Sequence, residues 1–389
     1  MNPQSLRWAT PVLLLAAACG VYRLAVAGNQ EPPIEVAKPH ANLVVPRYDE
    51  PLVATDEQLH GLLARMRPPA GKPDTNIWVH ALRMWGPQAK FDDPAHPDGE
   101  TMLAYYLDDR EFRRLAGDAA PPLFEIDEYG VRVRPWFAAN DHQRTGAVHV
   151  DDLLATLAES GVPLDTPLYT RDGETTVGAL LDRAMLHFHR DQHEYEWSLI
   201  SYARYVFPTL EWTTKYGERM TVDEAVDELI EQDPHNGICG GTHRLEALVV
   251  LNRVDERYNV LPRRTKQKLL AHLADMSRRL VASQYPDGQW GKNWPRGAAA
   301  LAEDPGVIDD QILATGHHLE WLALAPPEVQ PPRETIVRAG QWIARTMLEL
   351  DQADIERRYG PFSHAARALC LWRNMEPYEA WQQLEQRVD

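Results

Sequence analysis

Two copies of the pattern H-x-x-E-W hold the residue types best suited to chemistry. They are His193-Glu194-Tyr195-Glu196-Trp197 and His317-His318-Leu319-Glu320-Trp321, and His243-Arg244-Leu245-Glu246 repeats the pattern without the tryptophan. Residues three apart share one face of a helix, so each copy presents an imidazole beside a carboxylate, and chance predicts only about 0.03 full copies in this chain. The excess of this pattern over chance needs an explanation.

An imidazole beside a carboxylate is suited to general acid and base catalysis on a polar substrate. We therefore expect the following residues to be catalytic: His193, Glu196, His243, Glu246, His317 and Glu320. Trp197 and Trp321 end the two full copies and are expected to stack on the substrate. A second interpretation stays open, in which His–Glu pairs tie buried helices together and the tryptophans fill space.

Two groups of residues offer weaker metal-binding patterns. His189, His193 and Glu196 stand at i, i+4 and i+7 of an expected helix, and Cys239 precedes His243 by one helical turn at a glycine-rich helix start. Neither group has the spacing of an H-E-x-x-H or paired C-x-x-C site. We expect no cofactor, and a divalent metal ion is the less favoured option.

The charge balance restricts the class of partner. The chain has 57 acidic and 40 basic residues, a net charge of −17, with no basic cluster that would attract a phosphate backbone. We therefore expect a small-molecule or glycan ligand in a central cavity, and no nucleic acid. Outside the N-terminal segment the chain has two cysteines, Cys239 and Cys370, which could form one disulfide in an oxidising compartment.

Residues 1–27 have the pattern of an export signal. Arg7 precedes an apolar run from Trp8 to Ala27 that ends in small residues. Three outcomes stay open: cleavage after Ala27, lipidation of Cys19 as in a bacterial lipoprotein, or retention as an anchor, since about 20 residues span a bilayer. Each outcome predicts an exported protein, periplasmic or membrane-anchored, that contacts the membrane only through this segment.

The rest of the chain divides into a linker and one helical domain. Residues 28–50 are rich in Pro, Ala, Glu and Asn, which predicts a linker. Residues 51–389 show helical periodicity almost throughout, and alternation around a glycine predicts a small β-hairpin at 123–133. Residues 308–324 have two apolar faces, whereas 264–284 have one. Alternating buried and one-faced helices predict an all-α fold of two concentric rings, an α/α toroid.

The one-faced helix ends in a recognisable turn. The stretch Gln284-Tyr285-Pro286-Asp287-Gly288-Gln289-Trp290 resembles the QW repeat of the terpenoid cyclase and protein prenyltransferase toroids. The resemblance implies the toroid fold, with Gln284 bonding frayed backbone groups of the helix end. Val307-Ile308-Asp309-Asp310 lacks the first acid of the D-x-D-D motif of cyclases, so terpene cyclase activity is not expected.

The stretch Gly316–Trp321 also resembles the G-H-x-x-E-W signature of the N-acylglucosamine 2-epimerase family, whose members are (α/α)6 barrels. The resemblance implies that His317 is a functional histidine and Glu320 its neighbouring acid. We therefore expect an enzyme that acts on carbohydrate, by epimerisation or glycosidic cleavage, and that brings Glu196, His243, His317 and Glu320 together. The alternative is a non-catalytic toroid that binds a glycan, a lipid or a protein partner.

Overall fold

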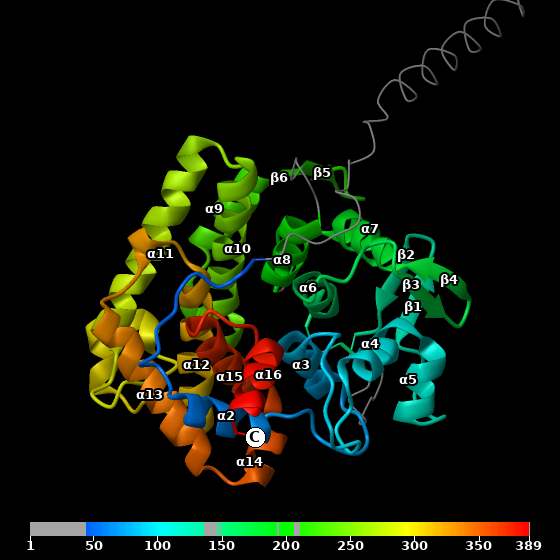
Figure 1. Ribbon diagram of the computed structural model, residues 1–389. Coiled ribbons are helices and arrows are strands. Elements are labelled where there is room, and N and C mark those ends of the chain that lie inside the picture. Colours follow the sequence, from blue (N-terminus) through cyan, green and yellow to red (C-terminus); the bar gives the residue numbers. More distant parts are fainter. Residues whose placement is uncertain (1–43, 136–145, 148, 193, 206–210, 389) are drawn as a thin grey trace, which may run out of the picture. The chain divides into compact units, whose positions relative to one another are not determined.

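The computed structural model describes residues 44–135, 146–147, 149–192, 194–205 and 211–388, and this part of the chain is mostly helical (Figure 1). The α-helices are α2 (Asp56–Arg65), α3 (Thr75–Trp85), α4 (Gly99–Leu107), α5 (Asp109–Ala116), α6 (Asp152–Glu159), α7 (Val177–His187), α8 (Tyr195–Tyr205), α9 (Val222–Glu231), α10 (Thr242–Tyr258), α11 (Arg263–Ser283), α12 (Ile308–Leu324), α13 (Arg333–Glu349), α14 (Gln352–Arg357), α15 (Tyr359–Trp372) and α16 (Pro377–Val388). Short 3-10 helices are η1 (Pro234–Asn236), η2 (Ile238–Gly241), η3 (Trp294–Ala302) and η4 (Pro327–Val329).

Three antiparallel strand pairs interrupt the helices. They are β1 (Phe124–Asp127) with β2 (Gly130–Val133), β3 (Pro167–Thr170) with β4 (Gly173–Thr176), and β5 (Glu211–Thr213) with β6 (Arg219–Thr221). The first pair confirms the hairpin predicted at 123–133. The other two were not predicted, and they lie in the part of the chain for which the sequence predicted helical periodicity almost throughout.

Six helices pack against one another in succession. Helix α3 packs on α6, α6 on α8, α8 on α10, α10 on α12 and α12 on α15, and α15 packs on α3. The succession of contacts therefore closes on itself. Helices α11 and α13 contact α10 and α12 respectively and lie outside them in Figure 1.

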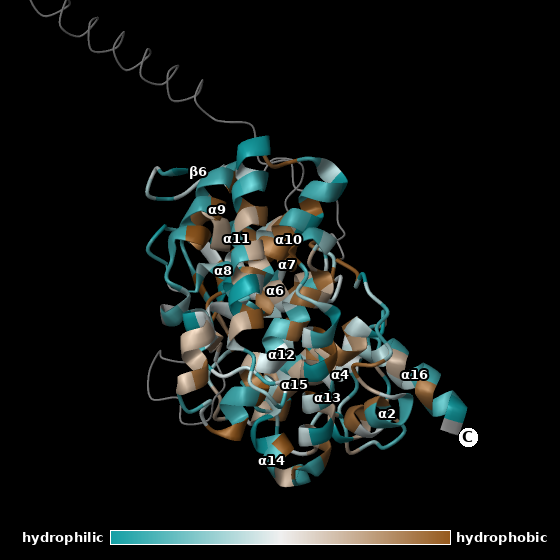
Figure 2. Cartoon of the chain, turned by 90° about the vertical axis from the view of Figure 1, so that its left-hand side faces the viewer, coloured by the Kyte–Doolittle hydropathy of each residue, from teal (hydrophilic) through white to brown (hydrophobic). Residues whose placement is uncertain are grey.

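Helices α12 and α11 bury the numbers of faces that their apolar patterns predicted. Helix α12 is buried on opposite faces, by Ile312, Leu319 and Leu322 on one side and His317, Glu320 and Leu324 on the other. Helix α11 buries one stripe, which includes Leu269, Leu273, Met276 and Leu280. Hydrophilic and hydrophobic residues accordingly alternate along α11 in Figure 2. The predictions of a doubly buried and a one-faced helix are confirmed.

The QW-like stretch joins α11 to its neighbours. Gln284 ends α11, and its Nε2 donates to the carbonyl oxygens of Gly288 and Thr335, both at 2.8 Å. The fully buried Trp290 donates from Nε1 to the carbonyl of Leu280 at 2.9 Å. Trp290 therefore bonds a carbonyl in the last turn of α11, whereas Gln284 bonds the following turn and α13 and not, as predicted, backbone groups of its own helix end.

Helices α12 and α15 approach closely at Gly316. A Cβ atom at this position would lie 2.7 Å from the Cα of Ala365, much closer than carbon atoms pack. Only glycine permits this spacing, because it has no side chain. Gly316 therefore sets the distance between the two helices at the level of His317 and His364.

The predicted export signal at 1–27, with Cys19, lies outside the described residues, as does most of the predicted linker. In the part of the chain that the structure describes, none of the helices is long and apolar enough to cross a bilayer. Cys239 and Cys370 are both free thiols, so the disulfide left open by the sequence does not form.

Candidate functional site

Four histidines from four of the six successive helices meet. They are His80 on α3, His243 on α10, His317 on α12 and His364 on α15. The ring centroid of His317 lies 4.7 Å from that of His243 and 4.0 Å from that of His364, and His80 lies 5.3 Å from His364. We call these four residues the imidazole cluster.

One helical turn further along, the same helices carry charged residues. These are Arg83, Glu246, Glu320 and Arg367, and α6 and α8 add Glu159 and Arg204. Oxygens of Glu159 lie 2.7 Å from Nε of Arg83, 3.5 Å from Nη2 of Arg204 and 4.0 Å from Nη2 of Arg367. We call this set the charged layer. Its members are buried, so mutual pairing must offset the cost of removing their charges from water.

Glu320 does not pair with the histidine of its own motif. It accepts a hydrogen bond from Nδ1 of His364 at 2.6 Å, and Arg367 donates to its other oxygen. Nδ1 of His317 instead donates to the backbone carbonyl of Leu313 at 2.8 Å. A carbonyl can only accept, so Nδ1 carries the proton. The buried Nε2 of His317 then holds a lone pair, which has no hydrogen-bond partner in the part of the chain that the structure describes.

The electrostatics keep the imidazole cluster neutral. Burial lowers the pKa of His243, His317 and His364 well below the ordinary value, and neighbouring histidines and Arg83 reinforce the shift. Burial together with Arg83 lowers the pKa of His80 to about 3. A neutral imidazole has a lone pair, so each ring can bind a metal ion or accept a proton.

The carboxylates respond to burial in the opposite sense. Burial raises the pKa of Glu320, and the guanidinium of Arg367 opposes this rise. Although burial disfavours its charge, Glu320 and Glu159 hold the pKa of Arg367 above its usual range. These directions agree with the expected effects of burial and mutual pairing.

The first full copy of H-x-x-E-W lies at the start of α8. His193 lies outside the described residues, and Glu196 and Trp197 are buried in the first turn of the helix. The ring of Trp197 lies 4.2 Å from that of His243, and the guanidinium of Arg83 lies 4.3 Å from the Trp197 ring centroid. Trp197 therefore packs directly on the imidazole cluster.

The other predicted residues divide between the cluster and its surroundings. Nδ1 of His243 lies 3.8 Å from Glu246, beyond hydrogen-bond distance. Trp321 is fully buried and donates to Nδ1 of His318 at 3.1 Å. The structure thus brings His243, Glu246, His317, Glu320 and Trp197 together, while Trp321 packs with His318.

The predicted helical face shared by His189, His193 and Glu196 does not form. Helix α8 begins at Tyr195, and His189 lies in the preceding loop, with its ring 6.0 Å from that of Tyr216. Residues 189–192 form a turn rather than a helix, and Glu194 has a φ of +60°, which is not helical. This expectation for a metal site was wrong in its local structure.

Three residues with positive φ precede three of the six helices. They are Asp151 before α6, Glu194 before α8 and Cys239 before α10, at φ values of +57°, +60° and +52°. Side chains other than glycine, asparagine and aspartate rarely adopt this conformation, which costs about 1–3 kcal/mol and often occurs at functional sites. Glu194 and Cys239 are therefore the strained residues, and they indicate the N-terminal ends of α8 and α10 as the functional side.

Cys239, His243 and His317 form a group that could hold a metal ion, because one ligand atom from each lies within 4.8 Å of the others. Cys239 lies in a turn that only glycines can close. A Cβ at Gly237 would lie 2.5 Å from Cα of Gly241, and a Cβ at Gly241 would lie 2.8 Å from the carbonyl oxygen of Pro234. Burial, with Glu194 and Glu196 nearby, raises the pKa of the Cys239 thiol to about 12.

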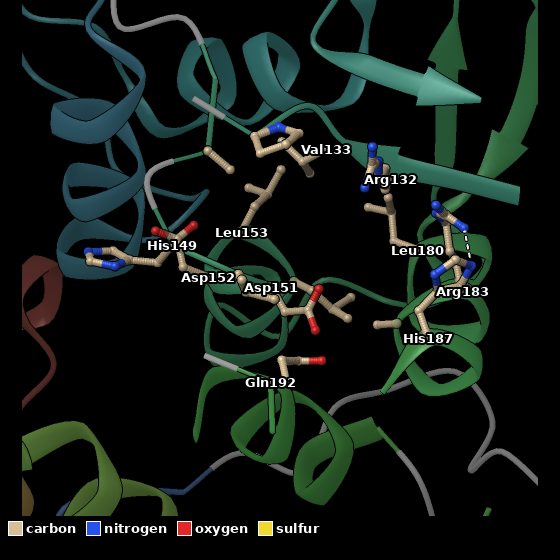
Figure 3. Close-up of a pocket in the computed structure, with 15 residues that line it drawn as sticks. Arg132, Val133, His149, Asp151, Asp152, Leu153, Leu180, Arg183, His187 and Gln192 are labelled. Atoms are coloured by element: carbon tan, nitrogen blue, oxygen red, sulfur yellow. Dashed lines mark hydrogen bonds between the residues drawn. The ribbon is translucent and has the colours of Figure 1, made fainter. Parts of the chain in front are cut away.

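A cavity of about 200 Å³ lies at the N-terminal end of α6 (Figure 3). Leucines at 153, 154 and 180 supply apolar walls, and the polar side chains that line it are Arg132, His149, Asp151, Asp152, Arg183, His187 and Gln192. Figure 3 shows Arg183 and His187 on one side and His149 at the opposite edge. An apolar cavity with a few convergent polar groups is typical of a small-molecule site.

His149 connects this cavity to the imidazole cluster. Its Nδ1 lies 2.8 Å from Oε2 of Glu194, and its ring centroid lies 6.2 Å from that of Trp197, which packs on His243. Although burial disfavours its charge, the hydrogen bond to Glu194 raises the pKa of His149. A ligand in the cavity would therefore lie next to a carboxylate-oriented imidazole.

Asp151 should make stability depend on pH. It stands at the N-cap of α6 but caps no backbone group, and it accepts a hydrogen bond from Ser198. Burial raises its pKa to about 6, although the bond from Ser198 opposes the rise. Between about pH 4 and pH 6 the native state then binds more protons than the unfolded state, so stability falls as pH rises.

Asp151→Asn should remove this loss. We compare the free energy of unfolding of the variant with that of the wild type by urea unfolding at pH 4 and at pH 7. Because Asp151 is only partly buried, we expect this difference to shift in favour of the variant by about 1–2 kcal/mol from pH 4 to pH 7. Asp172→Asn, in the exposed β3–β4 turn, is the control for loss of one negative charge. A difference between variant and wild type that is the same at both pH values would contradict the prediction.

Comparisons with known proteins find no matching family model, no matching curated protein and no matching solved structure. The geometry of the site is therefore the basis for any functional assignment.

Sequence reasoning missed two members of the imidazole cluster. His80-Ala81-Leu82-Arg83 and His364-Ala365-Ala366-Arg367 have the same spacing as the H-x-x-E copies but end in arginine. A search for histidine followed three residues later by either charge would have found all four helices. Glu159 and Arg204 have no such signal, because neither follows a histidine at that spacing.

Proposed function

We propose that the six successive helices form the inner ring of an α/α toroid, and that the protein is an exported enzyme acting on carbohydrate in the cavity at the N-terminal end of α6. The closed succession of contacts from α3 to α15 supports the toroid. The epimerase-like stretch Gly316–Trp321 supports the substrate class, and the pattern of residues 1–27 supports export to the periplasm or attachment to the membrane.

The observation that carries the proposal is the convergence of the imidazole cluster with carboxylates from separate helices. In two His–Glu pairs the carboxylate orients the imidazole through Nδ1: His364 with Glu320 at 2.6 Å and His149 with Glu194 at 2.8 Å. Of the two histidines, only His149 has a raised pKa and is suited to accept a proton. A carboxylate that accepts from Nδ1 fixes the tautomer and leaves Nε2 as the basic nitrogen. This is the arrangement that general acid and base catalysis uses.

His149 is the proposed base nearest the substrate. It lines the cavity, whose other polar groups include Asp151 and Gln192. These side chains offer hydrogen bonds to sugar hydroxyl groups, while the leucine walls exclude water. His364 does not line this cavity, and its lowered pKa suits it to hold Glu320 rather than to accept a proton.

Isotope exchange tests the proposed function. The full-length protein is incubated in D2O with a panel of aldoses, N-acylated hexosamines and glycosides. Epimerisation by proton abstraction replaces the C–H next to the carbonyl with C–D, which NMR detects, and glycoside cleavage produces new reducing ends. We expect one of these signals, slowed about 100-fold in His149→Gln.

His235→Gln is the matched control, because His235 is exposed and pairs only locally, with Asp233. Equal rates in wild type and His149→Gln would exclude His149 as the base. Absence of both signals for every sugar would leave the second candidate function.

That second candidate is a non-catalytic toroid that binds a glycan, lipid or protein. One observation favours it: both oxygens of Glu320 are already engaged by His364 and Arg367, as in a structural network. Binding of an unmodified glycan by the wild-type protein without isotope exchange would support this alternative.

A further inference from the structure

We propose that Cys239, His243 and His317 bind a zinc ion. The site lies between the start of α10 and the middle of α12 and shares His243 and His317 with the imidazole cluster. Binding itself does not depend on the proposed enzymatic function, whereas a catalytic role for the ion does.

The three side chains have a suitable geometry. Their ligand atoms lie within 4.8 Å of one another. Tetrahedral zinc, with bonds of about 2.3 Å to sulfur and 2.0 Å to nitrogen, requires ligand atoms about 3.3–3.7 Å apart. Inward movement of the side chains by about 1 Å would satisfy these bonds, without a change of fold.

His317 is already oriented as a ligand. Its Nδ1 donates to the carbonyl of Leu313, and its buried Nε2 has no hydrogen-bond partner among the described residues. Metal-binding histidines typically hold the other ring nitrogen in this way, which fixes both tautomer and ring orientation. A buried lone pair without a partner is costly, and a metal ion would remove that cost.

His243 and Cys239 complete the set from one short segment. Nδ1 of His243 is likewise buried, and no residue in the described part of the chain forms a hydrogen bond with it. The glycine turn at 237–241 holds Cys239 in a strained conformation one turn before His243. The strained backbone at Cys239 does not cap a helix, and a metal ion bound by the thiol would explain why this conformation is present.

The donor set selects the metal. One thiolate and two imidazoles suit zinc, whereas magnesium and calcium prefer oxygen ligands. The ion would also remove the proton from the buried Cys239 thiol, because a coordinating thiol is deprotonated. Three protein ligands leave one tetrahedral position for water or a substrate oxygen, as in catalytic zinc sites. If the proposed function is correct, the ion would polarise the carbonyl group of a sugar whose oxygen occupies this position.

Metal analysis and cobalt substitution test the site in the full-length protein. We expect about one zinc per chain by mass spectrometry, and a thiolate-to-cobalt charge-transfer band after replacement with Co²⁺. Cys239→Ser and His317→Asn should weaken binding by roughly a hundredfold or more, since even outer partners of metal ligands contribute 10–100-fold. Cys370→Ser and His235→Asn are the controls and should retain the band.

A protection experiment covers the case in which a variant fails to fold. In the wild-type protein, Zn²⁺ should slow alkylation of Cys239 while leaving that of Cys370 unchanged, as followed by peptide mass spectrometry. Absence of the cobalt band in the wild type, no protection of Cys239, or unchanged zinc content in folded Cys239→Ser would overturn the proposal. Zinc binding without sugar turnover would refute only the proposed function.

Discussion

Glu320→Ala is expected to lower the free energy of unfolding by about 3–5 kcal/mol, because it leaves a buried charge without its partner. The carboxylate of Glu320 is 1% exposed and is engaged by His364 and Arg367. After its removal, the closest remaining carboxylate oxygen to Arg367 is that of Glu159, at 4.0 Å. Urea unfolding followed by circular dichroism measures the loss.

Two variants show whether the cause is the unpaired charge. Arg367→Met combined with Glu320→Ala removes both ions, so the double variant should recover part of the loss. Glu334→Ala, at the exposed start of α13, should stay within about 0.5 kcal/mol of the wild type. Glu320→Ala and Arg367→Met are also measured separately. If the loss of stability in the double variant equals the sum of the two separate losses, the two charges do not stabilise each other.

The periodicity of the sequence was sufficient to predict which helix faces are buried. The two apolar stripes of 308–324 and the single stripe of 264–284 correspond to α12 and α11, because the face a residue occupies depends only on its spacing along the helix. The same rule predicted that His317 and Glu320 share a buried face. Spacing along one helix does not predict which residues of other helices that face contacts.

The pairing inside the site could not be predicted for that reason. The partner of Glu320 is His364, on a different helix and 44 residues away. The H-x-x-E spacing suggested a pair within the motif, but Nδ1 of His317 bonds the backbone of its own helix instead. Periodicity gives the face, whereas partners depend on how helices are placed in space.

Backbone conformation was the other missing element. The sequence Gly237-Ile238-Cys239-Gly240-Gly241 indicates a turn, but not that Cys239 itself takes positive φ. Glu194 likewise has positive φ just before α8, where the pattern had placed His189 and Glu196 on one helix. Residues with strained backbone conformations depart from the usual relation between sequence and local structure. Sequence patterns therefore do not predict these conformations, which occur mainly at functional sites.

Gly316→Ala should disturb the site without changing any polar group. The new methyl group would lie 2.7 Å from both Cα and Cβ of Ala365, so α12 and α15 would have to separate. Overpacking of this kind costs about 1–3 kcal/mol or more. Separation of the helices would also draw His317 away from His364, whose ring centroids lie 4.0 Å apart.

Gly61→Ala is the matched control, because Gly61 is also inside a helix but its Cβ would meet only a side-chain atom of Leu348, at 3.3 Å. Alanine gains up to about 1 kcal/mol over glycine in a helix, so this variant should be neutral or more stable. We expect Gly316→Ala to be less stable by about 2–3 kcal/mol in urea unfolding and to bind Co²⁺ more weakly. Equal stability of the two variants would show that α12 and α15 can move apart at little cost, and the spacing of the imidazole cluster would then not depend on Gly316.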